Sequence, residues 1–325
     1  MAKDDSPIAR AFRDEGLEVI PRAFKRSGQF ADFARCVRDF RELKPALVGT
    51  HSNIDSRVAL AAAAAAGVAR RVRYRHVSIP VRVSPWNRLI YRRFATHVVT
   101  TARSIADDLA GDFSLPPDAV RSIPTGVSPA ADAGDARREV KEKLGLPAGA
   151  RIVTQVSVLR SWKGHAYLIG AFHRLAKAHP DLHLVLVGTG SMLEPLTAQV
   201  ASLSLDGRVH FAGHQADPYP FFMAADVVAL ASTGGEGVPQ SVLQCFACAR
   251  PFVGTTVGGI PDIVRHGRNG LLVPPADADA LASGIREILD DETLASALAA
   301  NARQSFLDTG TVDHMGATLR GFLGL

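Results

Sequence analysis

The stretch EGVPQSVLQCFACARPFVGTTVGGIPD, which spans residues 236–262, decides the fold. It comes after an apolar run over 226–232 that predicts a strand. Small and apolar residues over 240–249 predict a helix buried against a sheet, and a proline ends that helix before a second strand over 252–256. Because apolar strands that alternate with helices form parallel sheets covered on both faces, this stretch predicts an α/β fold.

The same stretch predicts a ligand site. Glu236 follows the first strand, and the backbone amides near Gln240 and Ser241 open the helix after it. Open α/β sheets bind phosphorylated ligands at the carboxyl ends of their strands, where helix N-termini attract anions. The expected ligand is therefore of the nucleotide type.

The length of 325 residues allows two ordinary domains. Hydrophobic residues make up 47% of the chain and charged residues 21%, as in water-soluble globular proteins, and no apolar run reaches the roughly 20 residues of a membrane span. The first residues are polar, so no signal peptide is expected. The three cysteines include Cys245 and Cys248 in the expected buried helix, where core packing is favoured over a redox or zinc site. A reducing, cytoplasmic compartment is expected.

Positive charge gathers in the first half of the chain. Residues 1–130 hold 21 Lys and Arg against 13 Asp and Glu, whereas the remaining residues hold 16 against 19. This asymmetry favours an anionic partner, such as a phosphorylated substrate or a membrane surface, and a solvated arginine face is the alternative. No RNA- or DNA-binding motif accompanies the charge, so no nucleic-acid partner is expected.

One predicted helix in the basic half has an amphipathic face. Over residues 85–94, one face carries Trp86, Leu89, Ile90 and Phe94, with arginines around it. Such a helix lies either on an anionic bilayer or against its own sheet. The sequence leaves both possibilities open.

Strands and helices alternate along the whole chain. Apolar runs predict strands over 17–20, 46–50, 72–76, 96–101, 120–124, 152–158, 183–187, 209–213, 226–232 and 252–256. The segments between them predict helices, among them those over 30–43, 167–179 and 280–288. We therefore expect two doubly wound, Rossmann-like parallel-sheet domains that face a cleft.

The stretch over 236–262 resembles the donor-site motif of the retaining glycosyltransferases of family 4, which have the two-domain GT-B fold. In that motif a Glu is followed after seven residues by a second Glu and then by a Gly-Gly-x-Pro-Glu/Asp turn. Glu236 fills the first position and residues 258–262, GGIPD, fill the turn, whereas Gln244 replaces the second Glu. The resemblance covers nearly the whole chain.

The resemblance implies an acceptor-side domain over residues 1–128, a linker over 129–150 and a nucleotide-sugar donor domain over 151–307. The C-terminal segment 308–325 is expected to pack back on the first domain. The first residues of the chain look like the segment that comes after the family's second strand. The family's first strand and Gly-rich loop are therefore expected to be absent.

Two cations follow the first strand of the donor domain. Breaking the bond between a sugar and a diphosphate builds negative charge on the phosphates, so an enzyme needs cations and N–H donors there. Arg160 and Lys163 supply both kinds of cation. The family's pattern is Arg, four residues, Lys-Gly; Lys163 fits it, but Val158 occupies the Arg position, and Arg160 is the expected substitute. Two exposed loop cations are the alternative.

The resemblance gives roles to further residues. Glu236 is expected to bind hydroxyls of the donor sugar, Gln244 the ribose, and the amides of Gln240 and Ser241 the diphosphate. A carboxamide still accepts and donates hydrogen bonds, though more weakly than a carboxylate accepts them. A decayed site, with Gln244 simply a buried polar residue, is the alternative.

Two histidines end strands of the first domain. His76 matches the family's first-domain histidine, which lies near the donor sugar and the acceptor, and in a retaining enzyme it positions substrate rather than attacking it. His51 ends a neighbouring strand and is a second candidate on the acceptor side. Ordinary polar strand ends are the alternative for both.

No metal ion and no cofactor are expected. Asp277 and Asp279 have the spacing of a metal-binding Asp-x-Asp, but they precede a predicted helix and read as its cap. The nucleotide sugar is a co-substrate.

The leading hypothesis is a metal-independent, retaining hexosyltransferase that acts on a glycan or lipid-linked glycan in envelope polysaccharide or lipopolysaccharide synthesis. It would act in the cytoplasm or peripherally on the inner face of the plasma membrane. The alternatives are a nucleotide-sugar epimerase-like enzyme on the same fold and a non-catalytic homologue that binds a nucleotide sugar or a partner.

Overall fold

The structure, a computed structural model, describes residues 6–21, 29–76, 80–130 and 134–325. Contacts between Cα atoms divide the chain into two compact units. The first contains the residues up to His76 together with Val81–Val99 and Ala106–Arg121, and the second contains Thr100–Ile105 and Ser122–Leu325.

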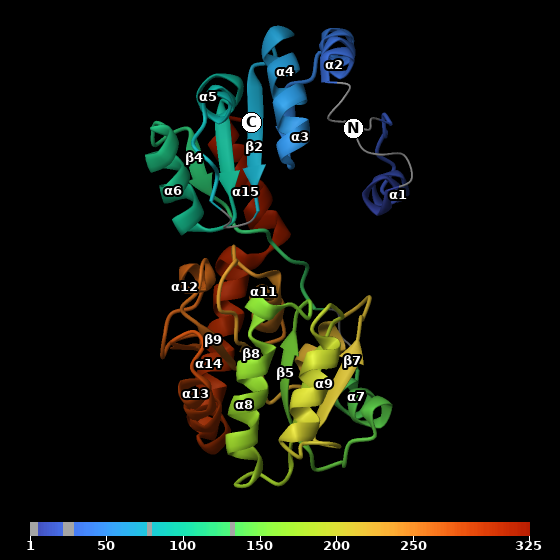
Figure 1. Ribbon diagram of the computed structural model, residues 1–325, viewed down its shortest axis with the longest axis vertical. Helices are drawn as coiled ribbons and strands as arrows, with labels where there is room; N and C mark the ends of the chain where they lie inside the picture. The colour runs from blue at the N-terminus through green and yellow to red at the C-terminus, as the bar shows by residue number, and fades with distance from the viewer. Residues whose placement is uncertain (1–5, 22–28, 77–79, 131–133) are drawn as a thin grey trace. The chain divides into compact units, whose positions relative to one another are not determined.

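A four-stranded sheet in the order β1-β2-β3-β4 forms the centre of the first unit (Figure 1). β1 and β2 run parallel, with Leu47 opposite Arg70. The strands are β1 (Leu47–Thr50), β2 (Arg70–Arg75), β3 (His97–Thr100) and β4 (Val120–Ser122). The helical segments are α1 (Pro7–Asp14), α2 (Gln29–Leu43), α3 (Asn53–Asp55), η1 (Ser56–Leu60), α4 (Ala61–Ala65), α5 (Pro85–Leu89), η2 (Ile90–Phe94) and α6 (Arg103–Phe113).

The core of the first unit lies between α2, β1 and the continuous helical run from α3 to α4. Cys36 and Phe40 of α2 pack there with Val48 of β1 and the small side chains Ala62 and Ala63. Because alanines leave room for close approach, the alanine tract lets this helical run lie near α2.

The strand predicted over 17–20 is wrong. These residues form no strand, and Pro21 takes part only in a β-bridge. A proline has no N–H to donate to a ladder, so a four-residue run that ends at one makes a poor strand. The expected absence of an opening strand rests on the first residues of the chain. Of these, residues 3–5 lie outside the described residues.

A six-stranded parallel sheet in the order β10-β9-β8-β5-β6-β7 forms the centre of the second unit (Figure 1). The strands are β5 (Arg151–Val156), β6 (Leu182–Val187), β7 (Val209–Gly213), β8 (Val227–Leu230), β9 (Phe252–Thr255) and β10 (Leu271–Val273). The helical segments are α7 (Ala136–Leu144), η3 (Ser161–Lys163), α8 (His165–Ala176), α9 (Leu193–Ser202), α10 (Tyr219–Ala224), α11 (Gln240–Ala247), α12 (Ile260–Ile263), α13 (Ala278–Asp290), α14 (Glu292–Ser305), η4 (Phe306–Gly310) and α15 (Val312–Leu323).

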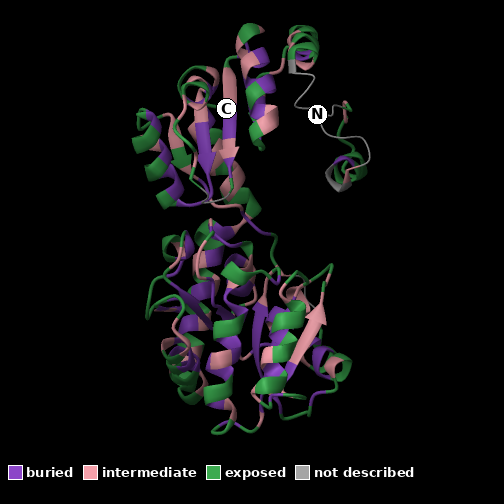
Figure 2. Cartoon of the chain, in the orientation of Figure 1, coloured by how far each residue is buried: buried purple, intermediate pink, exposed green. Residues whose placement is uncertain are grey.

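Apolar clusters on the faces of this sheet pack it against its helices. One contains Leu168 and Phe172 of α8 with Ile285 of α13, and another contains Phe246 of α11 with Phe306 of η4. Figure 2 shows the central strands buried and the outer sides of α8 and α9 exposed. These helices are amphipathic because only one side of each faces the sheet.

The predicted domain boundaries stay predictions. Within the predicted linker, residues 131–133 lie outside the described residues, while Val140 of α7, Leu146 and Ala150 join a core cluster of the second unit. The segment predicted as a return to the first domain also groups with the second unit, where Val127 forms a parallel bridge with Thr311.

Candidate active site

The loops after β5 and β8 meet at the carboxyl edge of the second sheet. β5 and β8 are neighbours in this sheet, so the loops that leave them start side by side. Gln155, fully buried at the end of β5, joins them: its Nε2 donates to the carbonyl of Lys163 at 2.9 Å, and its Oε1 accepts from the amide of Ala231 at 3.1 Å. The amide of Thr233 also donates to the carbonyl of Trp162 at 2.8 Å.

Lys163 and Glu236 contact each other where these loops meet. Lys163 Nζ lies 2.6 Å from Glu236 Oε1, and Ser232 Oγ donates to the same oxygen at 2.5 Å. Glu236 is only 5% exposed, and Ser232 is fully buried. Burying a carboxylate is costly unless a cation and hydrogen bonds compensate for the lost water, and Glu236 has both. The cation and the carboxylate predicted to bind a nucleotide sugar therefore form one preformed pair.

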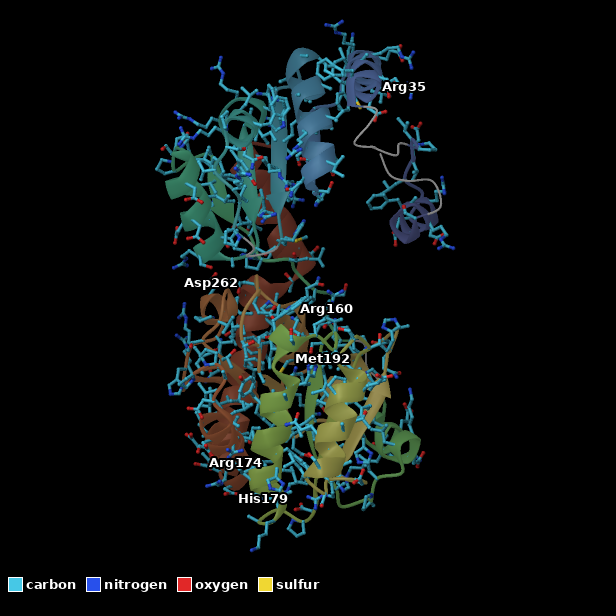
Figure 3. All side chains as sticks on the ribbon, viewed as in Figure 1. Arg35, Arg160, Arg174, His179, Met192 and Asp262 are labelled. Carbon is cyan, nitrogen blue, oxygen red and sulfur yellow. The ribbon has the colours of Figure 1, made fainter. Side chains whose placement is uncertain are left out.

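The glycine turn supports Glu236 from its backbone side. Gly258 has a φ of +55°, and a Cβ there would lie 2.2 Å from the carbonyl oxygen of Glu236. The amide of Gly259 donates to the carbonyl of Gly237 at 3.2 Å. At the end of the turn, Asp262, labelled in Figure 3, accepts a hydrogen bond from the amide of Arg103 at 2.6 Å. Any side chain at residue 258 would push this turn away from Glu236.

Arg160 lies exposed on the same loop as Lys163 (Figure 3). Its guanidinium carbon is 5.2 Å from the ring centre of Trp162, within the range of a cation–π contact. The loop is anchored at Leu159, whose carbonyl accepts from the amide of Met192 at 3.1 Å. The expected contact of Arg160 with a diphosphate stays a prediction.

Helix α11 starts next to Glu236 without a side-chain cap. Pro239 is its N-cap residue, and no side chain there accepts a hydrogen bond from the first turn. Gln240 is exposed, Ser241 is partly exposed, and Gln244 lies half-buried one turn further along. A helix N-terminus whose amide groups have no side-chain cap can bind an anion. The predicted phosphate contacts of Gln240 and Ser241, and the ribose contact of Gln244, stay predictions.

His51 and His76 lie together in the first unit. They follow β1 and β2, and His51 Nδ1 is 2.8 Å from His76 Nε2. Both histidines are exposed. The structure thus brings together two residues that the sequence places 25 positions apart. Their predicted roles near a donor sugar and an acceptor stay predictions.

His165 is a buried group that sequence reasoning did not consider. It begins α8 directly after Gly164, and its Nε2 lies 3.0 Å from Ser157 Oγ. Burial, assisted by the nearby charge of Lys163, lowers the pKa of His165 to about 4. The imidazole is therefore neutral at physiological pH and helps to hold the Lys163 loop on β5.

This shift predicts how stability changes with pH. The unfolded chain binds a proton near pH 6.5 and the folded chain only near pH 4, so protonation favours unfolding. The contribution of His165 is complete above pH 6.5 and is lost as the pH falls towards 4; at pH 5 the loss is about 2 kcal/mol. Urea unfolding at pH 7 and pH 5 measures it. His165→Gln should lose less stability between these values than the wild type.

His173→Gln is the matched control for this prediction, because His173 is exposed on the same helix. It should behave like the wild type. An equal loss of unfolding free energy between pH 7 and pH 5 in the wild type, His165→Gln and His173→Gln would contradict the role given to His165.

The structure confirms the predicted helix cap at Asp277 and the predicted core position of Cys245. Asp277 caps α13 by accepting from the amides of Asp279 and Ala280, and Asp279 pairs with Arg174. Within the described ranges, no group of three or more His, Cys, Asp or Glu side chains is arranged to hold a metal ion. Cys245 is fully buried, and burial raises the pKa of both Cys245 and Cys248, so neither is an activated thiol.

The amphipathic helix over 85–94 packs within its own unit. Ile90 and Tyr91 of η2 are buried, and the Tyr91 ring stacks on Phe113 at 4.6 Å between ring centres. Trp86 is 44% exposed, and Arg88, Arg92 and Arg93 are exposed. None of the helices in the described part of the chain combines the length and apolar character that crossing a bilayer requires.

Sequence reasoning missed Gln155 and Ser232. Each is a polar residue in or directly after an apolar strand, and both are fully buried. A polar residue inside or directly after an apolar strand was the sequence signal that could have identified them, because a buried polar side chain needs a specific partner.

Comparison with known proteins identifies the family. Residues 136–305 match the model of the glycosyl transferases group 1, and residues 2–131 match that of Glycosyltransferase Family 4. The first match covers just over half of the chain, so this chain belongs to the glycosyl transferases group 1.

Curated relatives share part of their length with the chain. The lipopolysaccharide core biosynthesis glycosyltransferase LpsE of Rhizobium meliloti is 34% identical over 167 residues, which cover 51% of this chain and 48% of that protein. The GDP-mannose-dependent alpha-(1-6)-phosphatidylinositol monomannoside mannosyltransferase of Mycolicibacterium smegmatis is 33% identical over 219 residues, which cover 64% and 57%. The matched part spans about half the length of these relatives.

Solved structures confirm the predicted fold class of two Rossmann-like parallel-sheet domains of the GT-B type. Anabaena HepE, solved in complex with UDP, has a TM-score of 0.87 at 22% identity over 98% of this chain and 90% of HepE. A glycosyltransferase from Rickettsia africae has a TM-score of 0.88 at 18% identity over 99% and 88%. At these identities the likeness concerns the fold.

Proposed function

We propose that this chain is a metal-independent, retaining glycosyltransferase that moves a sugar from a nucleotide-diphosphate sugar to a glycan or lipid-linked glycan. The observation that carries the proposal is the pair of Lys163 and Glu236, buried at the carboxyl edge of the second sheet in a member of the group 1 family. Further support comes from HepE, whose structures contain UDP and UDP-glucose.

The pair suits the charge changes of glycosyl transfer. Negative charge grows on the diphosphate as the sugar leaves, and Lys163, with three N–H donors, can contact a phosphate oxygen while it remains bonded to Glu236. Because Glu236 holds the ammonium in place before the donor arrives, little reorganisation is needed at the moment of reaction. Arg160 and the open N-terminus of α11 would bind the remaining phosphate charge.

The donor sugar and the nucleoside would bind on either side of the Lys163–Glu236 pair. The second carboxylate oxygen of Glu236 would accept from sugar hydroxyls, and Gln244 would bind the ribose diol. His76 would position the sugar, and His51 would lie on the acceptor side. No cofactor is needed, because the nucleotide sugar supplies both the leaving group and the transferred sugar.

The acceptor and the location are proposed from the relatives and from the charge of the chain. The relatives include a lipopolysaccharide core enzyme and a phosphatidylinositol mannoside mannosyltransferase. Trp86 and the exposed arginines of the helix over 85–94 provide a surface that suits an anionic membrane. We therefore place the enzyme in the cytoplasm, with peripheral contact to the inner face of the plasma membrane.

One experiment tests the reaction class. The purified chain is titrated by calorimetry with UDP, GDP and ADP, and then incubated with the matching nucleotide sugars and a lipid-linked glycan extract. We expect one nucleotide class to bind, the product to keep the anomeric configuration of the donor by NMR, and EDTA to leave the rate unchanged. Release of an altered free sugar without an acceptor would instead indicate an epimerase. A folded chain that binds no nucleotide would exclude a transferase.

A further inference from the structure

The contact between His51 and His76 has a well-defined geometry. The two imidazole planes differ by 1°, and the ring centres are 5.1 Å apart. Since one nitrogen of each ring lies only 2.8 Å from the other, the rings cannot be stacked face to face and must meet edge to edge. At this distance one of the two facing nitrogens carries a proton and the other accepts it.

His51 is held from two other sides. Its amide donates to Asp55 Oδ2 at 3.2 Å, within the capping box that Ser52 and Asp55 form at the start of α3. Its ring lies parallel to that of Tyr74 within 4°, with 4.5 Å between the ring centres. Tyr74 reaches this position across Gly49 of β1, where a Cβ would lie 3.0 Å from the Tyr74 ring. The orientation of His51 is thus fixed by parts of the first unit other than His76.

A buried positive charge lies beside the pair. Arg73 is 2% exposed, and its guanidinium donates to the carbonyl of Tyr74 and to Asn53 Oδ1, each at 2.9 Å. Burial lowers the pKa of both histidines, and the charge of Arg73 lowers both further, while Asp55 opposes this effect at His51. These shifts favour the neutral form of both rings, and the charge of a protonated His76 would also lower the pKa of His51.

We propose that His51 and His76 act as one proton-sharing pair, in which the tautomer of each ring fixes that of the other and His51 is a positioning residue for His76. The inference rests on the proposed function only in that His76 lies near the substrates. If His51 Nδ1 carries the shared proton, His76 must carry its own on Nδ1. If His76 Nε2 carries it, His51 must carry its own on Nε2. The two remaining nitrogens are therefore always one donor and one acceptor.

This coupling gives the pair a chemical use. A proton accepted at His76 Nδ1 can be balanced by transfer of the shared proton from His76 Nε2 to His51 Nδ1 and release of the proton on His51 Nε2. No net charge then accumulates beside Arg73. The pair can thus present either a donor or an acceptor to a hydroxyl group of the substrate without forming an imidazolium beside Arg73.

The test observes the imidazoles directly and needs no substrate. The full chain is labelled with 15N-histidine, and long-range proton–nitrogen spectra are recorded from pH 4 to pH 8. In the wild type we expect the two rings to show the same tautomer populations, both protonated on Nδ1 or both on Nε2, and two proton-binding steps that belong to the pair, separated by about one pK unit or more. In His51→Ala we expect a single step for His76.

Two variants complete the design. In His51→Gln the amide can still hydrogen-bond to His76 but does not titrate, so the two proton-binding steps should become one. His97→Ala removes another histidine of the first unit, one that bonds to Thr96, and should leave the His76 signals unchanged. An unchanged His76 titration in folded His51→Ala would overturn the proposal. Because no nucleotide sugar is present, this result is independent of whether the chain transfers sugar.

Discussion

Replacing Lys163 with alanine is expected to lower kcat for sugar transfer by about 100- to 1,000-fold. Lys163 Nζ is the cation that Glu236 holds in place, and in the proposed reaction the diphosphate gains further negative charge as its bond to the sugar breaks. A donor that interacts more strongly with the transition state than with the ground state acts on kcat more than on KM. Steady-state rates at saturating donor and acceptor measure the effect.

This substitution also removes the counter-ion of a buried carboxylate, so stability and catalysis have to be separated. The side chain of Glu236 is 6% exposed, and leaving it unpaired costs about 3–5 kcal/mol. The double variant Lys163→Met/Glu236→Gln removes both charges and should recover most of this stability without recovering the rate. Lys177→Ala, which removes an exposed lysine at the other end of α8, is the matched control and should keep full activity. Near-wild-type activity in Lys163→Ala would exclude diphosphate stabilisation by this residue.

Replacing Gly164 with alanine is expected to destabilise the second unit by about 3 kcal/mol or more. Gly164 has a φ of +70°, and a Cβ there would lie 1.7 Å from the carbonyl oxygen of Ala231. Two backbones meet at this point, so neither can move aside by a change of rotamer. The loop that carries Lys163 would have to separate from the loop that carries Glu236.

The variant Gly145→Ala separates the destabilisation caused by the steric clash at Gly164 from that caused by the left-handed backbone conformation alone. Gly145 has a φ of +65° but no neighbour within 4 Å of an added Cβ, so this variant should lose only about 1 kcal/mol, the usual cost of a left-handed alanine. Urea unfolding followed by the fluorescence of Trp162 in a Trp86→Phe background reports on the second unit alone, because the chain has two tryptophans. Equal losses in the two glycine variants would contradict the close contact at Gly164.

The apolar runs of the second half predict β5 to β9, but not the three-residue strand β10. Residues of β6, β8 and β9 are mainly apolar, and β5 continues an apolar run that contains the buried Thr154 and Gln155; a strand buried on both faces has such a pattern regardless of its neighbours. The run over 17–20 forms no strand; it ends at Pro21, which has no N–H to donate to a ladder. Local composition predicts which residues are buried, but it does not predict which strands pair with each other.

The candidate site, too, was predictable from the sequence only in part. Residue type and position after a strand were enough to select Lys163 and Glu236, because phosphate and sugar chemistry require such side chains at such places. Their contact was not predictable, since they lie 73 residues apart and meet only because β5 and β8 are neighbours in the sheet. For the same reason, the roles of Gln155 and Ser232 and the bond between His51 and His76 emerged only from the tertiary structure. A sequence determines which chemical groups are available, whereas strand order determines which of them touch.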